Sequence, residues 1–540
     1  MTRKCCVLIL AATIVALALR LPRLSQRPMH GDEAVHAIKF GELLEKGFYK
    51  YDPYEYHGPT LNYLTLIPAW LTSAENITEV NEFTLRIVPV FCGVLMVLFI
   101  LFIADGLGSN SAVFAAILTA VSPAMIYFSR YYVQEVLLVC FTFGLIVSGY
   151  RYFQSRKIIW AILAGIFAGL MHASKETCII NFGSLILSLI IVHLILHRKN
   201  SFVNAFKSIK TSHLIACILA AIVVSVSFFS SFFKNPHGIL DSILTYTTYF
   251  NRAGNNSLHI NPWYYYLRIL LFYRYENGPI WTDAFIVILA AIAFIAALKK
   301  KGLPFGDVNL VRLLGFYTLI QIIVYSAIPY KTPWCMLGFI HGLILLAGVG
   351  AAILISKTSK FLPRLIVSLL LLAGTGHLIW QAYLSNFVYY ADSYNPYVYA
   401  HPTTEIYTLV EKVEHYARVD PQGKNMYIEV ICPGNDYWPL PWYLRSFTAV
   451  AYRDHVDMTE PSAPLIIASP SVEADLTKKI YDDSIPFEQR HLYMFLFEDN
   501  PYYIWLRPQI KLVGFVREDL WDASQNVSDP NELMRNSSEQ

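Results

Sequence analysis

The run CMLGFIHGLILLAGVGAAILI at residues 335–355 is 21 residues long and contains no Asp, Glu, Lys or Arg. A helix needs about 20 largely apolar residues to cross the hydrocarbon core of a bilayer, so we predict that this run spans a membrane. Ten more runs of this kind occur along the chain, at about 5–21, 84–104, 111–128, 136–153, 158–173, 177–196, 212–233, 281–298, 311–328 and 363–384. Together they predict a polytopic α-helical membrane protein with about 11 transmembrane helices.

The composition of the 540 residues agrees with this prediction, since 55% are hydrophobic and 15% are charged, with a mean hydropathy of +0.43. An ordinary soluble chain is nearer ~25% charged. A purely soluble enzyme, a disordered protein and a collagen-like fibre are thereby excluded. The eight cysteines form no Cys-x-x-Cys pair, so they indicate neither a disulfide framework nor a zinc ribbon. There is no G-x-x-x-x-G-K-[ST] loop and no G-x-G-x-x-G after a strand, so we do not expect a hydrolysable nucleotide as substrate. We expect the lipid bilayer as a partner, and no nucleic acid.

Charge is unevenly distributed along the chain. Residues 1–390 have 30 Lys and Arg against 16 Asp and Glu, whereas residues 391–540 have 12 against 23. The basic residues collect in loops on one side of the predicted membrane, which the positive-inside rule assigns to the cytoplasm. We therefore place the N-terminus inside the cytoplasmic (plasma) membrane and, with eleven spans, the C-terminal domain outside. The first run ends in Arg20-Leu21-Pro22-Arg23 without a small-residue cleavage site, so we interpret it as a signal anchor.

We predict three parts of the chain. Residues 1–384 form a transmembrane domain with long outer loops at 22–83 and 234–280. Residues 385–521 form a soluble, extracytoplasmic α/β domain, because short apolar runs alternate there with polar and proline-containing segments. Residues 522–540 are polar, and we expect a disordered tail.

Ionisable side chains at membrane depth or at the mouth of a span are costly, so each needs a reason. In the predicted topology these residues all face outward: Asp32, Glu33, His57, Arg130, Glu135, Lys175, Glu176 and Lys331, with Tyr330 beside the last. Independent ion pairs would scatter over both faces, so we infer one outward cavity. Structural alternatives exist: Asp32-Glu33 can be acids at a helix N-terminus, Arg130 and Glu135 a helix-end salt bridge, and Tyr330-Lys331 an interfacial anchor.

Such a cavity has specific chemistry available to it. A carboxylate beside a membrane surface can act as general base on an acceptor hydroxyl. The cations Arg130, Lys175 and Lys331 can hold a lipid phosphate and stabilise the charge that develops on it. No cofactor is certain. A divalent cation such as zinc or manganese is an open alternative, and its candidate ligands are His30, Asp32, Glu33, His36 and His57.

Five motifs follow one another in the first part of the chain. They are His30-Gly31-Asp32-Glu33-Ala34-Val35-His36-Ala37, Tyr56-His57-Gly58-Pro59-Thr60-Leu61, Glu82-Phe83-Thr84-Leu85-Arg86-Ile87-Val88-Pro89, Ser122-Pro123 through Ser129-Arg130-Tyr131 to Glu135, and Gly169-Leu170 to Ser174-Lys175-Glu176. In this order they resemble the C-type glycosyltransferase superfamily (GT-C), in the branch with protein O-mannosyltransferases and lipid A aminoarabinose transferases. Two later stretches, Tyr330–Trp334 and Tyr437–Arg445, are similar to the flippase-activity-associated proteins of bacteria and archaea.

The resemblance implies transfer of a sugar from a polyprenyl-phosphate donor to a glycan, lipid or protein acceptor on the extracytoplasmic face. It implies Asp32 as catalytic base, with Glu33 supporting it or helping to hold a metal. Relatives often have Lys-Pro-Pro where this chain has His57-Gly58-Pro59. The expected donor-phosphate and substrate-binding residues are His57, Arg130, Glu135, Lys175, Glu176, Tyr330 and Lys331.

The sequence leaves two alternatives open. Besides a transferase, the chain can be a non-catalytic partner of a lipid-linked-sugar flippase, or a protein that binds or translocates lipid-linked sugars. Translocation needs a polar route through the membrane, and the predicted inner loops have no matching cluster of membrane-depth charges. In the C-terminal domain, Tyr437, Trp438 and Trp442 can form a sugar-stacking loop over the active site, or an ordinary turn and helix start of the α/β core.

Overall fold

A computed structural model describes residues 2–54, 57–195, 209–255, 259–299, 303–481, 491–498 and 501–525. The chain divides into two compact units, each of which is described by itself. The first, which we call the membrane unit, comprises residues 1–25 and 39–399. The second, the sheet unit, comprises residues 26–38 and 400–540. The short segment 26–38 thus belongs with the C-terminal part of the chain, which the sequence did not indicate.

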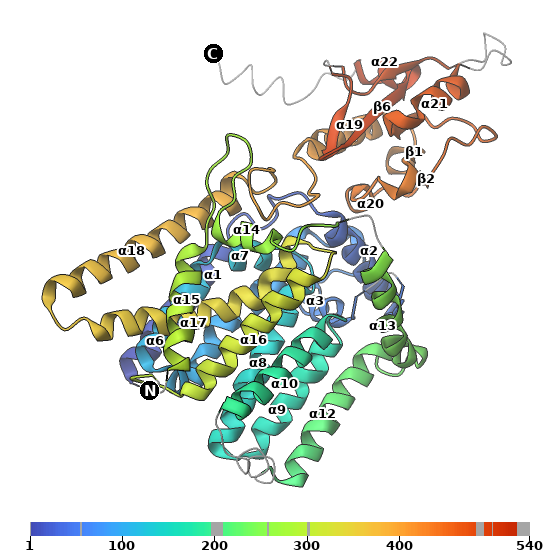
Figure 1. Cartoon of the computed structure of the whole chain (residues 1–540). Helices are drawn as coiled ribbons and strands as arrows, with labels where there is room; N and C mark the ends of the chain where they lie inside the picture. Colours follow the sequence, from blue (N-terminus) through green and yellow to red (C-terminus); the bar gives the residue numbers. More distant parts are fainter. Residues whose placement is uncertain are drawn as a thin grey trace. The chain divides into compact units, whose positions relative to one another are not determined.

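The membrane unit is helical (Figure 1). Its helices are α1 (Arg3–Arg20), the second half of α2 (Gly31–Lys46), α3 (Thr60–Leu71), α4 (Glu82–Phe99), α5 (Ala104–Leu107), α6 (Ser109–Val121), α7 (Pro123–Ser129), α8 (Glu135–Ser155), α9 (Ile158–His172), α10 (Cys178–Ile195), α12 (Thr211–Phe229), α13 (His237–Asn255), α14 (Tyr265–Leu271), α15 (Ala284–Leu298), α16 (Val308–Ala327), the 3-10 turn η3 (Pro333–Met336), α17 (Leu337–Lys357) and α18 (Phe361–Tyr383), which continues as the π-helical turn η4 (Leu384–Val388).

Every predicted apolar run folds as a helix, which confirms the predicted fold class. Among the described residues, seven helices are long and apolar enough to cross a membrane, and α6 with α7 makes an eighth if the bent pair is one span. Helices α9 and α15 are apolar but only 15 residues long, and α1 carries basic residues at both ends. The protein is therefore a multi-pass membrane protein, while the count of eleven spans stays a prediction.

The bend between α6 and α7 has a simple cause. Pro123 is the first residue of α7. Proline disfavours the helical conformation at the residue before it, and Ser122 accordingly has φ −59° and ψ 125°. The two helices meet at 55°. The chain then ends α7 at Ser129 and starts α8 at Glu135, so the predicted site residues Arg130 and Glu135 both lie at this turn.

Helix α17 is the centre of the membrane unit. Of the span Pro333–Lys357, 83% is buried within the protein, against 6% of α12 and 11% of the span Phe361–Val388. Figure 1 shows α17 running among α6, α15 and α16, all of which it contacts. The opening run of the sequence is therefore a core helix, whereas α12 and α18 present apolar surfaces suited to lipid.

The sheet unit is an α/β domain, as predicted. Its elements are α19 (Glu405–Val419), β1 (Ile428–Ile431), α20 (Leu440–Tyr443), β2 (Val450–Arg453), β3 (Leu465–Ala468), α21 (Glu473–Ile480), β4 (Tyr493–Phe495), β5 (Ile504–Arg507), β6 (Ile510–Arg517) and α22 (Glu518–Gln525). The strand order is β2-β1-β3-β6-β4, with β5 also paired to β6; β1 runs parallel to β2 and β3, and β6 is antiparallel to its neighbours.

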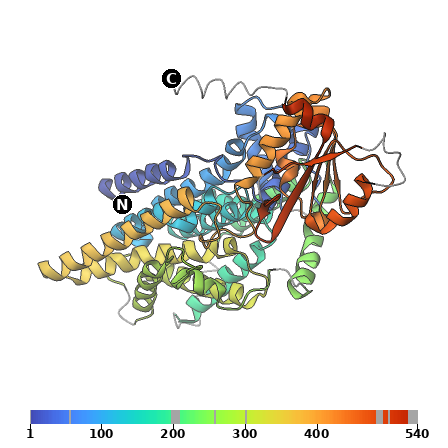
Figure 2. The same cartoon turned by 90° about the horizontal axis from the view of Figure 1, so that it is seen from above.

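Both faces of this sheet are covered. Helices α19 and α22 share one apolar cluster with the strands, and α21 shares another. Figure 2 shows helices on both sides of these strands. Strands β1 and β3 are accordingly buried along their whole length, which is usual for parallel strands covered by helices. Of the predicted C-terminal tail, residues 526–540 lie outside the described residues, and residues 522–525 complete α22.

Candidate active site

The Asp32-Glu33 pair lies in the first turn of α2, in the part of the helix that belongs to the sheet unit. Glu33 is fully buried, and its Oε2 accepts a hydrogen bond from the backbone N–H of His30 at 3.0 Å. Its Oε1 lies 3.6 Å from Nη2 of Arg27. An acidic side chain in the first turn of a helix can accept a hydrogen bond from the backbone N–H of the residue just before the helix, which has no partner within the helix. Glu33 therefore stabilises the start of α2.

Asp32 is placed differently. Its side chain is 53% exposed, and its backbone N–H donates to Nδ1 of His30 at 3.0 Å. The carboxylate lies in the first turn of α2, at the positive end of the helix dipole, where an acidic side chain stabilises the helix. Of the two adjacent acids, Asp32 is thus the one that presents a carboxylate to the surroundings of the protein.

In the membrane unit, a second group of site residues gathers around Glu176. This carboxylate is buried, and its Oε2 lies 2.8 Å from Nδ1 of His57. The hydroxyl of Tyr51 donates to its Oε1 at 3.1 Å. Burial acts to raise the pKa of Glu176, but His57, a backbone hydrogen bond and the Lys175 cation together outweigh it, and the pKa is lowered below its ordinary value. Glu176 is therefore an ionised carboxylate that holds the imidazole of His57 in place.

Lys175, the preceding residue, forms a buried ion pair with Glu135 at the start of α8. Burial acts to lower the pKa of Lys175, but the Glu135 carboxylate, together with Cys335 and Glu176, outweighs it and holds the pKa above its ordinary value. Lys175 consequently stays positively charged. Removing such a cation from water costs several kcal/mol of free energy. A buried ion pair with a purely structural role would therefore be energetically unfavourable.

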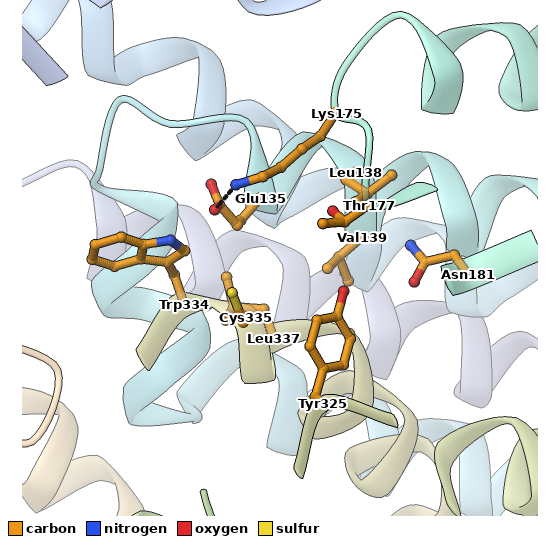
Figure 3. A pocket seen from close by; sticks show the side chains of 11 residues that line it. Glu135, Leu138, Val139, Lys175, Thr177, Asn181, Tyr325, Trp334, Cys335 and Leu337 are labelled. Carbon is orange, nitrogen blue, oxygen red and sulfur yellow. Dashed lines mark hydrogen bonds and ion pairs between the residues drawn. The ribbon is translucent and has the colours of Figure 1, made fainter. Parts of the chain in front are cut away.

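The ion pair lies on the wall of a small cavity (Figure 3). Thr177, Asn181, Tyr325, Trp334 and Cys335 contribute further polar or polarisable side chains, with Leu138, Val139, Leu337 and Gly338 between them. The space inside is about 20 Å³, enough for one water molecule. At this wall, the amide nitrogen of Asn181 donates to Thr142 Oγ1 at 3.0 Å, and its amide oxygen accepts from Nε2 of Gln321. Hydrogen bonds between side chains thus join α8, α10 and α16 at this level.

A close approach of two backbone segments brings His57 to Glu176. A Cβ atom on Gly58 would lie 2.2 Å from the carbonyl oxygen of Ala173, so no larger residue fits there without movement. The same carbonyl accepts from the backbone N–H of Thr60 at 3.1 Å and from its hydroxyl at 2.6 Å. The glycine in the His57-Gly58-Pro59 motif is therefore explained by packing against the turn that carries Lys175 and Glu176.

We expect Gly58→Ala to separate the two segments, because the new methyl group overpacks the contact with Ala173. The thermal midpoint in detergent should fall by the equivalent of about 1–3 kcal/mol, the usual cost of overpacking. Gly183→Ala is the matched control, since nothing lies within 4 Å of a Cβ at that position. Equal midpoints for the two variants would contradict the packing role.

Arg130 contacts backbone carbonyl oxygens and an aromatic ring. Arg130 donates from Nη2 to the carbonyl oxygens of Pro22 at 2.7 Å and Arg23 at 3.0 Å, and its guanidinium lies 4.8 Å from the ring centre of Phe387. It therefore ties the end of α1 to the turn before α8. The structure brings His57 together with Glu176, and Lys175 together with Glu135. The hydrogen bonds from Arg130 to Pro22 and Arg23 go to backbone carbonyl oxygens.

Lys331 is 1% exposed and donates from Nζ to the carbonyl oxygens of Asn261, at 3.1 Å, and Ile328. Burial lowers its pKa below the ordinary value. Tyr330, by contrast, is 44% exposed, and its backbone forms a β-bridge with Ile260. The pair thus fastens the segment before η3 to the segment before α14.

The aromatic residues predicted near 440 belong to the sheet unit. Trp442 is fully buried in the domain, so its ring has no face available for a sugar. The ring of Tyr437 packs 4.8 Å from that of Tyr452, and Trp438 is half-buried. These positions favour the core-turn interpretation for Trp442 and leave a sugar contact at Tyr437 or Trp438 as a prediction.

Metal binding also stays a prediction. Within the described ranges, no group of three or more His, Cys, Asp or Glu side chains is placed to hold a metal ion. Among the predicted ligands, His30 and Glu33 take part in the start of α2, and His57 contacts Glu176.

Several residues of the site were missed by sequence reasoning. Tyr51, Thr177 and Tyr325 carry no motif that distinguishes them from other hydroxyl-bearing residues. Asn181 could have been found, because an amide within an apolar run is costly in a membrane and asks for a partner. Trp334 lies in the stretch Tyr330–Trp334, but no role could be predicted for it, and the structure places it on the cavity wall.

The apolar helices, with buried polar groups at their ends, define the class of the protein: it is a multi-pass membrane protein. Comparisons with known proteins then identify its fold. Residues 65–250 match the family model described as Dolichyl-phosphate-mannose-protein mannosyltransferase. The fold is similar to that of ArnT from Cupriavidus metallidurans in the apo state, with a TM-score of 0.62 and 12% identity over 94% of this chain and 97% of that chain. ArnT bound to undecaprenyl phosphate gives 0.60 and 13% over the same shares.

The apo oligosaccharyltransferase of Archaeoglobus fulgidus gives a TM-score of 0.55 and 13% identity over 83% of this chain and 64% of that chain. None of the curated proteins matches the sequence. These findings confirm the resemblance at the level of the superfamily: the chain is a multi-pass membrane protein with the fold of the GT-C glycosyltransferases. The branch within that superfamily stays a prediction.

Proposed function

We propose that the protein transfers a sugar from a polyprenyl-phosphate donor to an acceptor on the extracytoplasmic face of the plasma membrane, with Asp32 as general base. One observation carries the assignment of the base. The Asp32 carboxylate is 53% exposed at the start of α2, while the adjacent Glu33 is buried and caps the same helix. A base must reach its substrate, and of these two carboxylates only Asp32 is exposed enough to do so.

The donor class rests on the fold and on what the similar proteins bind. One ArnT structure holds undecaprenyl phosphate, and the matched family is described by a dolichyl-phosphate sugar. In this chain, Lys175 stays charged, and the imidazole of His57 lies in a neighbouring loop. We assign Lys175 to the donor phosphate as a cation and His57 as a hydrogen-bonding partner, because preorganised charges and hydrogen-bond donors stabilise charge on a departing phosphate.

The proposed reaction is a single displacement. Asp32 takes the proton of an acceptor hydroxyl, and the hydroxyl oxygen forms a bond to the anomeric carbon of the sugar. The bond between that carbon and the phosphate oxygen breaks, and its electron pair leaves with the polyprenyl phosphate. Lys175 and His57 stabilise the phosphate as its charge grows, and the anomeric centre inverts.

The test is a transfer assay with the purified full chain in lipid nanodiscs. Labelled polyprenyl-phosphate mannose serves as donor probe, and a membrane and envelope extract serves as the acceptor pool. We expect the label to move to an acceptor and undecaprenyl phosphate to inhibit the transfer. Binding of the donor without transfer, over a broad screen of sugars and acceptors, would contradict the proposal and favour the non-catalytic alternative.

A further inference from the structure

The segment that carries Asp32 is held by residues far away in the sequence. The backbone N–H of Met29 donates to the hydroxyl oxygen of Tyr443 at 2.8 Å, and the hydroxyl of Tyr407 donates to the carbonyl oxygen of Gln26 at 3.1 Å. These partners are separated by 414 and 381 positions. Both hydrogen bonds go to the backbone, so they fix the path of the chain just before α2.

Ring contacts support the two tyrosines. The rings of Tyr407 and Tyr443 meet edge to face, 5.9 Å apart at 83°, an arrangement that aromatic pairs prefer. On the other side of Met29, the ring of His30 lies 4.8 Å from that of His401. A Cβ atom on Gly31 would be in van der Waals contact with Cβ of Trp438, at 3.7 Å. The segment is therefore packed by side chains of the sheet unit as well as hydrogen-bonded to them.

Tyr443 itself is rigidly placed. It ends α20, whose Leu440 and Trp442 side chains are fully buried in the domain core. The guanidinium of Arg445 lies 3.7 Å from the ring centre of Trp442 and donates to its carbonyl oxygen at 2.6 Å. The loop before α20 is held by Arg507, which donates to the carbonyl oxygen of Trp438 at 2.6 Å. The Tyr443 hydroxyl is thus fixed with respect to the sheet.

A short chain of contacts connects this hydroxyl to Asp32. Met29 precedes His30, whose backbone N–H is held by Glu33 and whose Nδ1 accepts from the N–H of Asp32. The Met29 hydrogen bond therefore sets the position of the residue from which α2 starts. A general base has to lie within hydrogen-bond reach of the proton that it takes, and a displacement of about 1 Å can cost about 10²-fold in rate.

We propose that Tyr443 is a positioning residue for Asp32, so that the C-terminal sheet unit is part of the device that places the catalytic base. This inference rests on the proposed function, because it requires Asp32 to be that base. It gives the sheet unit a role in the chemical step, in addition to the predicted sugar contact at Tyr437 or Trp438.

The test replaces Tyr443 by phenylalanine in the full chain, which keeps the buried ring and removes only the hydroxyl. Tyr481→Phe is the matched control, since the Tyr481 hydroxyl donates within the same unit to the carbonyl oxygen of Tyr493 at 3.4 Å. Hydrogen–deuterium exchange of peptides covering residues 26–34 should become faster in Tyr443→Phe and stay unchanged in Tyr481→Phe. With polyprenyl-phosphate mannose as donor, kcat should fall about 10-fold while KM for the donor changes less than about twofold.

Other outcomes overturn the inference, and they are distinguishable. A normal kcat in Tyr443→Phe, beside an inactive Asp32→Asn, removes the positioning role and leaves the proposed function standing. A fully active Asp32→Asn removes both, whatever Tyr443→Phe does. A lower thermal midpoint together with equal losses of kcat and donor affinity in Tyr443→Phe also contradicts the inference, because that pattern indicates a general structural role for Tyr443.

Discussion

Asp32→Asn is expected to leave the protein folded and able to bind undecaprenyl phosphate, but to lower the rate of sugar transfer by about 10²–10⁴-fold. This is the range that a positioned general base contributes. Asparagine has nearly the same shape as aspartate and cannot take the proton of the acceptor. The measurements are the initial transfer rate in nanodiscs, the thermal midpoint, and equilibrium binding of labelled undecaprenyl phosphate.

Asp420→Asn is the matched control for this variant. Asp420 lies in the same unit, and its Oδ1 accepts from the backbone N–H of Gln422 at 2.7 Å, a hydrogen bond that an asparagine oxygen can also accept. It should therefore transfer sugar at the rate of the unmodified protein. Full activity of Asp32→Asn would exclude Asp32 as the base, and the exposed carboxylate at the start of α2 would then need another role.

Lys175→Met is expected to have the second large effect. Methionine fills the volume of the lysine stem but carries no charge, so Glu135 is left as a buried carboxylate without its partner. Removing one member of a buried ion pair typically costs about 3–5 kcal/mol of stability. We also expect binding of undecaprenyl phosphate to weaken and transfer to fall about 10²–10³-fold, the usual effect of losing one preorganised electrostatic partner.

A double variant separates these two effects. Lys175→Met combined with Glu135→Gln removes the uncompensated charge, so the thermal midpoint should recover most of what the single variant lost. Transfer should stay low, because the phosphate still lacks its cation. A double variant that regains donor binding together with stability would show that the Lys175–Glu135 pair is structural. Donor binding should be measured at several salt concentrations, since an ionic contact weakens as salt rises.

The positions of the helices could be predicted from local patterns. The run at residues 335–355 and the ten others all became helices, because burial of apolar side chains and the backbone's need for internal hydrogen bonds leave few alternatives in a bilayer. The short apolar runs near 428 and 465 likewise became the buried strands β1 and β3. Hydropathy does not fix the span count, since α9 and α15 are only 15 residues long.

The candidate site could be predicted only in part. Charged residues near membrane spans are conspicuous, so Lys175, Glu135 and Glu176 were found. Which of them pair could not be predicted, because the contact between Lys175 and Glu135 crosses 40 positions and that between His57 and Glu176 crosses 119. Arg130 was expected at the donor phosphate, yet the contacts observed for it tie the turn before α8 to the end of α1.

The sequence by itself determined the class of protein, its helical runs and the residue types available for chemistry, because hydropathy and charge act over neighbouring positions. Only the tertiary structure decided which acid of the Asp32-Glu33 pair is exposed, and that the segment around them belongs with Tyr407 and Tyr443. The physical reason is that a hydrogen bond between residues hundreds of positions apart leaves no periodic pattern in either segment. It exists only once the sheet unit has folded around that segment.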